Sequence, residues 1–224
     1  MPKEALKTAR FFSLKGDEPF ASWLLQCTYP WESLADLGAW IKAYGATLPS
    51  ESYTEIAPDI WVAKSANVSD LATLKGPVIV GPDVEIRPGA FIRGNAYIGP
   101  NCVVGTASEI KNSLLFGDVE VPHYNYIGDS ILSYGTHFGA GAITSNLRSD
   151  KKNIKIRYEG EVIETGLRKI GAITAQRVEI GCNAVLGPGT LIGKDSLIYP
   201  LTFVRFSLPE KSILKNNGEL RLRI

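Results

Sequence analysis

Several features are scarce in this sequence of 224 residues. Histidine occurs twice, cysteine three times, and the formal net charge is only +1. A near-neutral charge argues against a dedicated nucleic-acid-binding protein. The three cysteines, Cys27, Cys102 and Cys182, form no CxxC motif, so they indicate neither a zinc cluster nor a disulfide framework. No apolar run is long enough for a membrane-spanning helix, and the N-terminus has no apolar core of a signal peptide. An odd cysteine count then favours a reducing, cytoplasmic location.

What the sequence does have is an apolar residue at every sixth position. The series is Val62, Val68, Leu74, Val80, Ile86, Ile92, Ile98, Val104, Ile110 and Phe116. Glycine, proline and asparagine fall between these positions, where a backbone must turn. Self-similarity at six residues is typical of a hexapeptide β-helix. We therefore expect a mainly β protein, a parallel β-helix in which three hexads form one coil. Residues eighteen apart then stack at about 4.8 Å, and each coil buries its apolar face only against its neighbours.

The register divides the chain into three parts. Residues 1–57 lie outside it, contain an expected amphipathic helix from Pro30 to Gly45, and hold three of the four tryptophans, the fourth being Trp61. Because the interior of a narrow prism has no room for tryptophan, we expect a small helical N-terminal cap at the end of the solenoid; a binding role is the weaker alternative. Residues 58–208 form the β-helix, with a loop excursion at 145–173 that contains a hairpin around Glu159 and Gly160. Residues 209–224 form a basic tail, expected to pack loosely.

The two histidines lie on either side of an irregularity in the register. Phe116 and the next good inward residue, Ile127, are eleven apart rather than twelve, and Leu132 follows Ile127 after five positions rather than six. A lone histidine is more often structural than functional, but registers usually break where a side chain is re-aimed. We therefore interpret His123 as a functional candidate and expect the break near it.

A second candidate is a column of cations. Lys75, Arg93 and Lys111 are eighteen apart and stack on one edge of the expected prism. Like charges this close repel by about 1 kcal/mol even in a water-like dielectric, a cost that an anion such as phosphate would relieve. Three solvated side chains that splay apart are an equally good interpretation. The loop that follows adds Asn146, Arg148, Lys151, Lys152 and Lys155, which either close over a ligand or form a solvated face.

Two motifs carry a family resemblance. HYNYIGDS at 123–130 and FGAGAITSN at 138–146, followed by Lys152, resemble the acetyltransferase domain of the bifunctional sugar-1-phosphate nucleotidylyltransferase/acetyltransferases. The bacterial type makes UDP-N-acetylglucosamine, and residues 146–155 look more like the archaeal type. The resemblance covers about residues 60–208. It implies a left-handed parallel β-helix, a homotrimer with sites between neighbouring prisms, acetyl-CoA as donor, and the hexapeptide-repeat acyltransferase superfamily.

The resemblance also implies roles for single residues. His123 matches the general base. Substrate-binding roles fall on Arg87, Arg93, Lys111, Tyr126, His137, Asn146, Lys152 and Lys155. Of these, Lys111 and an arginine contact phosphate, with Arg93 favoured by spacing and Arg87 by its Arg-Pro-Gly motif. Ala140 matches a residue whose backbone N–H contacts the ligands, and Cys182 stands where the bacterial type has a serine on the coenzyme A side.

Two departures from the family are visible. His137 replaces an asparagine that contacts the substrate in the bacterial enzymes. The Gly-rich G-x-G-T-R pattern of the nucleotidylyltransferase domain is missing. We therefore expect an acetyl-CoA-dependent N-acetyltransferase acting on an amino-sugar 1-phosphate, such as glucosamine-1-phosphate, without nucleotidylyl transfer.

Two other functions compete with this expectation. One is a non-catalytic trimeric module that binds sugar nucleotides or regulates a partner nucleotidylyltransferase. The other is a hexapeptide-type metal hydratase, which is disfavoured because such zinc sites use three histidines and this chain has two. No metal site is expected.

Overall fold

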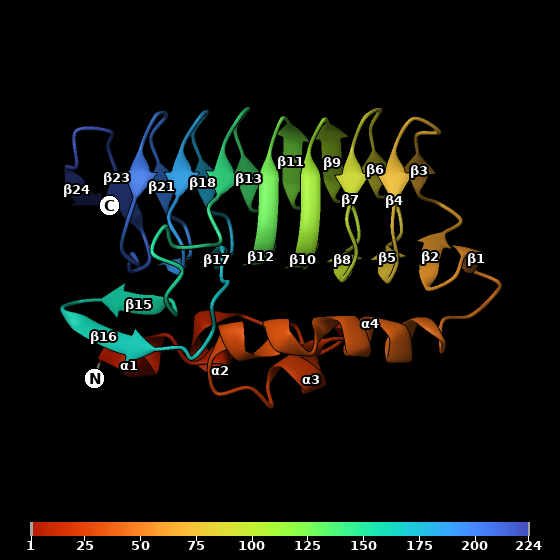
Figure 1. Cartoon of the computed structure of the whole chain (residues 1–224), viewed down its shortest axis with the longest axis horizontal. Helices are drawn as coiled ribbons and strands as arrows, with labels where there is room; N and C mark the ends of the chain where they lie inside the picture. The colour runs from red at the N-terminus through yellow and green to blue at the C-terminus, as the bar shows by residue number, and fades with distance from the viewer. Residues whose placement is uncertain (1, 224) are drawn as a thin grey trace.

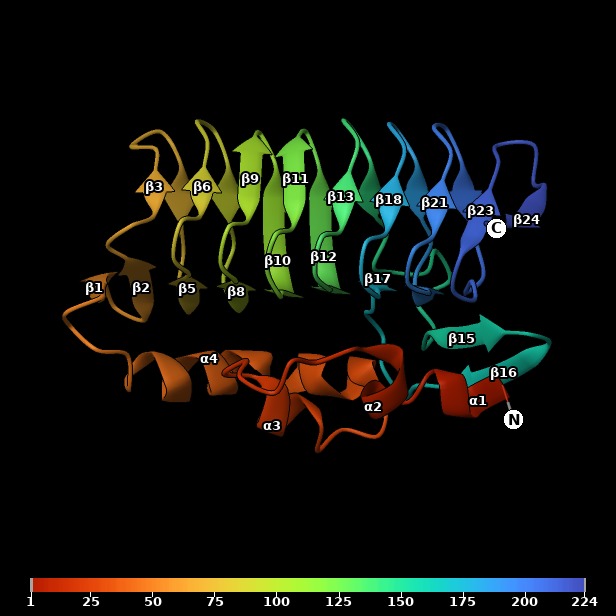
Figure 2. The same ribbon diagram turned by 180° about the vertical axis from the view of Figure 1, so that it is seen from behind.

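The computed structural model describes residues 2–223 and consists mainly of short β-strands stacked into a long three-sided prism (Figures 1 and 2). In Figure 1 the chain passes from the lower strand β5 to β6 at the rear, to β7 at the front, and down to β8, while it advances from right to left. That sense of rotation is left-handed. The expected fold class, a left-handed parallel β-helix of hexapeptide repeats with a small helical N-terminal segment, is confirmed.

Each face of the prism is a stack of parallel strands. Two faces are named by their place in Figure 1, rear and front, and the third is called the covered face because the N-terminal helices lie on it. The rear face consists of β3 (Asn67–Val68), β6 (Glu85–Ile86), β9 (Val103–Thr106), β11 (Glu120–His123), β13 (His137–Phe138), β18 (Glu179–Ile180), β21 (Leu197–Ile198) and β23 (Ser212–Leu214). The front face consists of β4 (Thr73–Leu74), β7 (Phe91–Ile92), the first halves of β10 (Glu109–Leu115) and β12 (Tyr126–Leu132), β14 (Ile143–Thr144), β19 (Val185–Leu186) and β22 (Phe203–Val204). The covered face consists of β2 (Ile60–Ala63), β5 (Val78–Val80), β8 (Ala96–Ile98), the second halves of β10 and β12, β17 (Ala172–Thr174) and β20 (Thr190–Ile192).

The interior is filled by the hexad residues. From Val80 to Ile110 the side chains at the sixth positions are at most 1% exposed and form one continuous apolar cluster. Val62, Val68 and Leu74 of the first coil are only partly buried, because no complete coil lies beneath them. Strand pairing joins Ile92 to Ile110 and Val80 to Ile98, which is the predicted spacing of eighteen.

The register breaks at a different place from the one expected. The residue stacked on Ile98 is Leu115, and Phe116 points outward into a second apolar cluster. The shortened steps between inward residues are therefore Ile110 to Leu115 and Ile127 to Leu132, each of five positions instead of six, where β10 and β12 run across a corner without a separate turn. The corner that carries His123 keeps its full length. The interpretation that the first break lies at His123 is wrong, since that break lies beside Asn112. The second break, from Ile127 to Leu132, lies beside Asp129 as the spacing predicts.

The N-terminal segment does not cap the end of the solenoid, contrary to expectation. Its helices lie along the covered face (Figures 1 and 2). They are α1 (Pro2–Ala5), α2 (Thr8–Phe11), α3 (Ala21–Leu24), the 3₁₀ helix η1 (Pro30–Ala35) and α4 (Leu37–Gly45). We call this segment the N-terminal layer. The physical reason is that the outward side chains of this face are apolar and need a cover: Ile79, Tyr97, Leu114, Ile131, Ile173 and Leu191 are all 0–5% exposed.

The N-terminal layer packs closely on the prism. Phe20 lies against Tyr97 and Phe116, with ring centroids 5.6 and 4.4 Å apart. A Cβ atom at Gly45, the last residue of α4, would lie 2.3 Å from the indole of Trp61, so only glycine allows this approach. Burial of each large apolar side chain contributes roughly 1.5–3 kcal/mol. The layer is therefore part of the folded core.

Both ends of the prism are closed by antiparallel strands. β1 (Tyr53–Ala57) pairs with β2 at the N-terminal end, and β24 (Leu220–Leu222) pairs with β23 at the other. The prediction that the tail from residue 209 packs loosely is wrong, since β23 continues the rear face in parallel with β21. The loop excursion holds the expected hairpin, β15 (Lys155–Tyr158) and β16 (Glu161–Glu164), which extends the cover of the N-terminal layer. Among residues 2–223, no helix is long and apolar enough to cross a membrane.

Candidate active site

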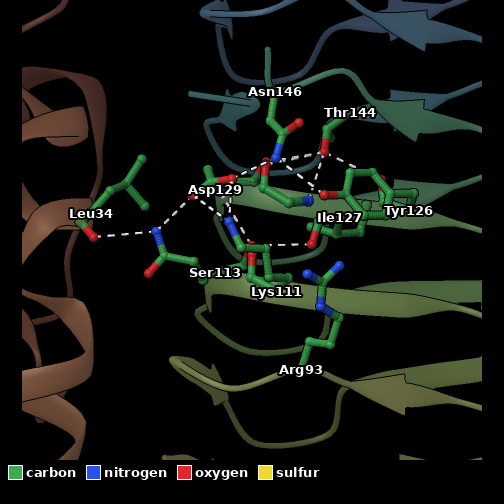
Figure 3. A network of polar contacts seen from close by, with 12 residues as sticks. Leu34, Arg93, Lys111, Ser113, Tyr126, Ile127, Asp129, Thr144 and Asn146 are labelled. Atoms are coloured by element: carbon green, nitrogen blue, oxygen red, sulfur yellow. Dashed lines mark hydrogen bonds and ion pairs between the residues drawn. The ribbon is translucent and has the colours of Figure 1, made fainter. Parts of the chain in front are cut away.

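The first candidate region is the corner between the front and covered faces, which we call the lysine edge (Lys111, Asn112, Asp129 and Asn146). Lys111 Nζ donates to both carboxylate oxygens of Asp129, at 3.1 and 3.0 Å. Asn112 Nδ2 donates to Asp129 Oδ1 at 2.9 Å, and Asn146 Nδ2 donates to Oδ2 (Figure 3). Asp129 is only 4% exposed. Three donors therefore satisfy a buried carboxylate, which would otherwise be costly to keep charged.

The shortened hexads explain this arrangement. Asn112 and Asp129 sit in the tightened corners with φ of 47° and 50°, a conformation that short polar residues tolerate best. Their side chains meet because the two corners lie on adjacent coils. The break in the register thus builds the network.

Tyr126 extends the network on the front face. Asn146 Nδ2 also donates to the Tyr126 hydroxyl at 3.1 Å (Figure 3). Burial raises the pKa of Tyr126, and the nearby carboxylates of Asp129 and Glu109 raise it further. The phenol therefore stays protonated and remains able to donate a hydrogen bond.

The predicted cation column exists, but its members are not free. Lys75 lies over the Phe91 ring at 5.3 Å, Arg93 Nη1 donates to Glu109 at 2.7 Å, and Lys111 is held by Asp129. The Glu109 hydrogen bond and charge raise the pKa of Arg93. Mutual repulsion is offset by these neighbours, so a phosphate bound here would share the cations with two carboxylates.

The second candidate region is the corner between the rear and front faces, which we call the histidine edge (His123, Asn125, Ala140 and Cys182). His123 has an exposed side chain, and its backbone N–H donates to Asn125 Oδ1 at 3.0 Å. The buried Asn125 amide donates to the carbonyls of Gly139 and Ala142, at 2.9 and 3.0 Å. Asn125 therefore fixes the backbone of His123 against the next coil.

His123, Ala140 and Cys182 occupy successive coils of this edge. The Gly141 N–H donates to the His123 carbonyl at 3.0 Å, and the Asn183 N–H donates to the Ala140 carbonyl at 2.9 Å. A Cβ atom at Gly139 would lie 3.0 Å from Cys182 Sγ. Within residues 2–223 the Ala140 N–H has no hydrogen-bond partner. An exposed histidine and a free backbone donor thus lie on adjacent coils.

The other predicted substrate-binding residues lie elsewhere in the chain. His137 is on the rear face between two glutamates, with Nδ1 3.0 Å from Glu179 and Nε2 3.9 Å from Glu120. Arg87 pairs with Glu85 at 3.0 Å on the same face. Lys155 pairs with Glu164 at 2.6 Å within the β15–β16 hairpin. Lys152 is exposed in the loop. The structure thus brings together Arg93, Lys111, Tyr126 and Asn146 but not these four.

Sequence reasoning did not identify the carboxylate that accepts hydrogen bonds at the lysine edge, nor the asparagines that hold the backbone and side chains of both edges in place. Asp129, Asn112 and Asn125 were not singled out, although Asn112 follows Lys111, Asn125 precedes Tyr126 and Asp129 lies in the motif that begins at His123. The signal was available for Asp129, because it lies within the shortened step of five positions from Ile127 to Leu132. In the described part of the chain, no group of three or more His, Cys, Asp or Glu side chains is placed to hold a metal ion.

Comparison with known proteins identifies the relatives of this arrangement. Residues 74–162 match the family model described as the GMPPB C-terminal domain. A bifunctional sugar-1-phosphate nucleotidylyltransferase/acetyltransferase of Sulfurisphaera tokodaii is 36% identical over 152 residues, and a bifunctional protein GlmU of Methanococcus maripaludis is 36% identical over 133 residues. These alignments cover 60% and 59% of this chain but only 38% and 32% of the relatives. The chain therefore spans about a third of the length of these relatives. The resemblance expected from the sequence is confirmed.

Solved structures show more distant similarity. A hexapeptide transferase family protein from Anaplasma phagocytophilum aligns with 73% of this chain and 78% of its own at 13% identity, with a TM-score of 0.42. The acetyltransferase domain of PglB from Neisseria gonorrhoeae, in complex with acetyl coenzyme A, covers 71% and 56% at 12% identity, with a TM-score of 0.39. Similarity at this level carries no argument about function.

Proposed function

We propose that this chain, which is homologous to the acetyltransferase region of the bifunctional sugar-1-phosphate nucleotidylyltransferase/acetyltransferases, is an acetyl-CoA-dependent N-acetyltransferase. The acceptor is the amine of an amino-sugar 1-phosphate, such as glucosamine-1-phosphate. The observation that carries the proposal is the histidine edge, where His123 is exposed, braced by Asn125, and followed on the next coil by the free Ala140 N–H.

The reaction needs a base and an oxyanion donor. His123 takes a proton from the amine of the amino sugar while the amine nitrogen attacks the thioester carbonyl of acetyl-CoA. The Ala140 N–H donates to the oxygen on which negative charge develops. Collapse of that intermediate forms the amide and expels the coenzyme A thiolate, which is then protonated. No covalent bond to the protein is required. Cys182, on the following coil, lies on the coenzyme side of His123.

The lysine edge supplies the acceptor contacts in this proposal. Lys111 and Arg93 bind the phosphate by charge-assisted hydrogen bonds. The grouping of Arg93 with Lys111 supports it over Arg87 for this role. The protonated phenol of Tyr126 and the amide of Asn146 donate to the sugar hydroxyls. Lys152, exposed in the loop, closes over the bound ligand.

We further propose a cytoplasmic homotrimer with sites between neighbouring prisms. Large apolar side chains are exposed along the histidine edge: Leu71 is 74%, Tyr124 66% and Leu201 70% exposed. Exposed apolar side chains that recur along one edge of the prism favour contacts between neighbouring copies of the chain. Sedimentation velocity tests this point, and a monomer at micromolar concentration would contradict it.

The activity is tested by thiol release from acetyl-CoA with glucosamine-1-phosphate and galactosamine-1-phosphate as acceptors. Loss of a general base typically costs about 10²- to 10⁴-fold, so we expect kcat of His123→Ala to fall in that range with the circular dichroism spectrum unchanged. Equal turnover by the variant would exclude His123 as the base. If the folded wild-type protein releases no thiol with any acceptor, the alternative gains support: a non-catalytic sugar-nucleotide-binding or regulatory partner of a nucleotidylyltransferase.

A further inference from the structure

A cavity lies between the N-terminal layer and the base of the loop excursion, next to the lysine edge. Its volume is about 460 Å³, within the range of small-molecule sites. It is lined by Leu34, Ala35, Asn112, Leu147, Leu167, Arg168 and Lys169. The floor is fixed because the two strands of the loop base pair at Leu147 and Lys169, and the Ile170 N–H donates to the Asn146 carbonyl at 3.1 Å.

The charge of this cavity has one sign. Arg168 and Lys169 are its charged residues, and no carboxylate lines it. Neither cation makes an ion pair within residues 2–223, whereas Arg93, Lys111 and Lys155 each have an acidic partner. Two adjacent unpaired cations in a concave site attract an anion. A guanidinium and an ammonium that line one cavity are both able to bind phosphate oxygens.

The remaining walls are apolar and come from two distant parts of the sequence. Leu34 and Ala35 are the last two residues of η1, and Leu147 and Leu167 belong to the base of the loop excursion. Asn112 joins the cavity to the lysine edge, since its Nδ2 donates both to the Leu34 carbonyl at 3.3 Å and to Asp129. Both amide hydrogens of Asn112 are thus used, which leaves the two cations as the polar donors to a ligand.

We propose that this cavity binds a nucleoside diphosphate, with its phosphates on Arg168 and Lys169 and its base against the leucine side chains. A single inorganic phosphate would fill only a small part of the space and would leave the apolar walls without a partner. The binding does not depend on acetyl transfer, so it stands or falls separately from the proposed function.

The test is isothermal titration of the full chain with UDP, GDP, uridine and inorganic pyrophosphate in the absence of acetyl-CoA. We expect at least one nucleoside diphosphate to bind more tightly than pyrophosphate or uridine. Because a hydrogen bond to a charged group is lost, Arg168→Gln should weaken it about tenfold. Lys64→Gln removes one exposed cation outside the cavity and should leave the affinity unchanged. The proposal would be overturned if UDP and GDP both failed to bind at millimolar concentration. It would also be overturned if Arg168→Gln bound them as tightly as the wild type.

A second variant tests the cavity without changing charge. Ala35→Phe places a ring in the space that the base would occupy, at a position that is exposed in the structure and tolerant of a larger side chain. We expect nucleoside diphosphate affinity to fall at least tenfold while the thermal midpoint stays the same. Unchanged affinity would place the nucleotide elsewhere and refute the assignment.

Two sources of the nucleotide can be separated by kinetics. If the bound nucleotide occupies space that the acceptor also needs, UDP or GDP will compete with glucosamine-1-phosphate in the thiol-release assay. If it is a free effector, the nucleotide will alter turnover without competition. Both results require the cavity, and Ala35→Phe must abolish either one.

Discussion

The covered face and the front face of this prism present similar side chains to the interior and different side chains to the outside. Inward, both present the apolar hexad residues of one continuous core. Outward, the covered face carries Ile79, Leu114 and Ile131, all at most 1% exposed beneath the N-terminal layer. The front face carries Glu109 and Tyr126, which are partly exposed; Glu109 pairs with Arg93, and Tyr126 accepts a hydrogen bond from Asn146 of the lysine edge. The comparison shows that the inward pattern builds the solenoid, whereas the outward residues decide whether a face is covered by protein or left open to a ligand.

The largest effect on stability is expected where the covered face is broken. Phe20 is 1% exposed and packs on Tyr97 and Phe116, so Phe20→Ala should lower the free energy of unfolding by about 3–5 kcal/mol. Urea denaturation measures this loss. Phe91→Ala on the front face is the matched control, since Phe91 is only partly buried, and it should cost less than half as much. Equal losses would mean that the layer does not stabilise the prism.

On the front face, the expected effect is on acceptor binding as well as on stability. The three partners of Asp129 all donate hydrogen bonds to its carboxylate. In Asp129→Asn, the amide NH₂ would face these donors and could not accept from them. We expect about 1–3 kcal/mol less stability and, under the proposed function, an acceptor KM raised roughly tenfold. Glu109→Gln removes the more exposed carboxylate of the same face and should cost under about 1 kcal/mol. A larger effect from Glu109→Gln than from Asp129→Asn would contradict the role given to the buried carboxylate.

A smaller effect links the covered face to pH. The Glu18 carboxylate accepts hydrogen bonds from the Lys15 and Gly16 N–H groups, at 2.6 and 2.8 Å, and from the Tyr134 hydroxyl at 2.8 Å. Burial raises the pKa of Glu18, but these hydrogen bonds outweigh burial and hold it below its ordinary value. Because the folded pKa is depressed, the stabilisation is complete above the unfolded pKa of about 4.3 and is lost as pH falls through the folded pKa.

Glu18→Gln tests this linkage. At pH 7 we expect the variant to be about 1 kcal/mol less stable than the wild type, with the gap closing as the pH falls below about 4. Thermal melts at several pH values measure the gap. A gap that stays constant down to pH 3 would show that the carboxylate charge is not the cause.

The smallest effect is expected at the hairpin. Lys155 and Glu164 are paired at 2.6 Å, but their side chains are 41% and 64% exposed. Surface ion pairs contribute little, so Lys155→Gln should change the free energy of unfolding by less than about 0.5 kcal/mol. Urea denaturation would reveal a larger loss, which would mean that the pair anchors the loop excursion.

Much of the fold could be predicted from the sequence, because a period of six is a local property. The inward residues from Val80 to Ile110 and the hairpin around Glu159 needed no tertiary information. The place of the N-terminal layer could not be predicted in this way. It depends on which outward residues are apolar, and an amphipathic helix is equally suited to the end of a prism and to its side.

The candidate site was predictable only in part. The cation column followed from the spacing, but its acidic partners did not, because Asp129 reaches Lys111 only after a hexad loses one residue. His137 and Lys155 matched family positions, yet His137 lies beside glutamates of the neighbouring coils and Lys155 pairs with Glu164 across its own hairpin. The six-residue spacing predicts the coil and the face on which a residue lies. It does not predict which side chain that residue contacts.

The sequence by itself determined a parallel hexapeptide prism and the motif that carries His123, since repeat period and local motif are written in consecutive residues, and the resemblance carried by that motif implied the left-handed sense. Only the tertiary structure decided that the helices cover one side, that Asp129 holds Lys111, and that η1 and the loop base enclose a cationic cavity. Each of these depends on contacts between residues far apart in the sequence. Such contacts form only after the coils have stacked, and the stacking fixes which side chains meet.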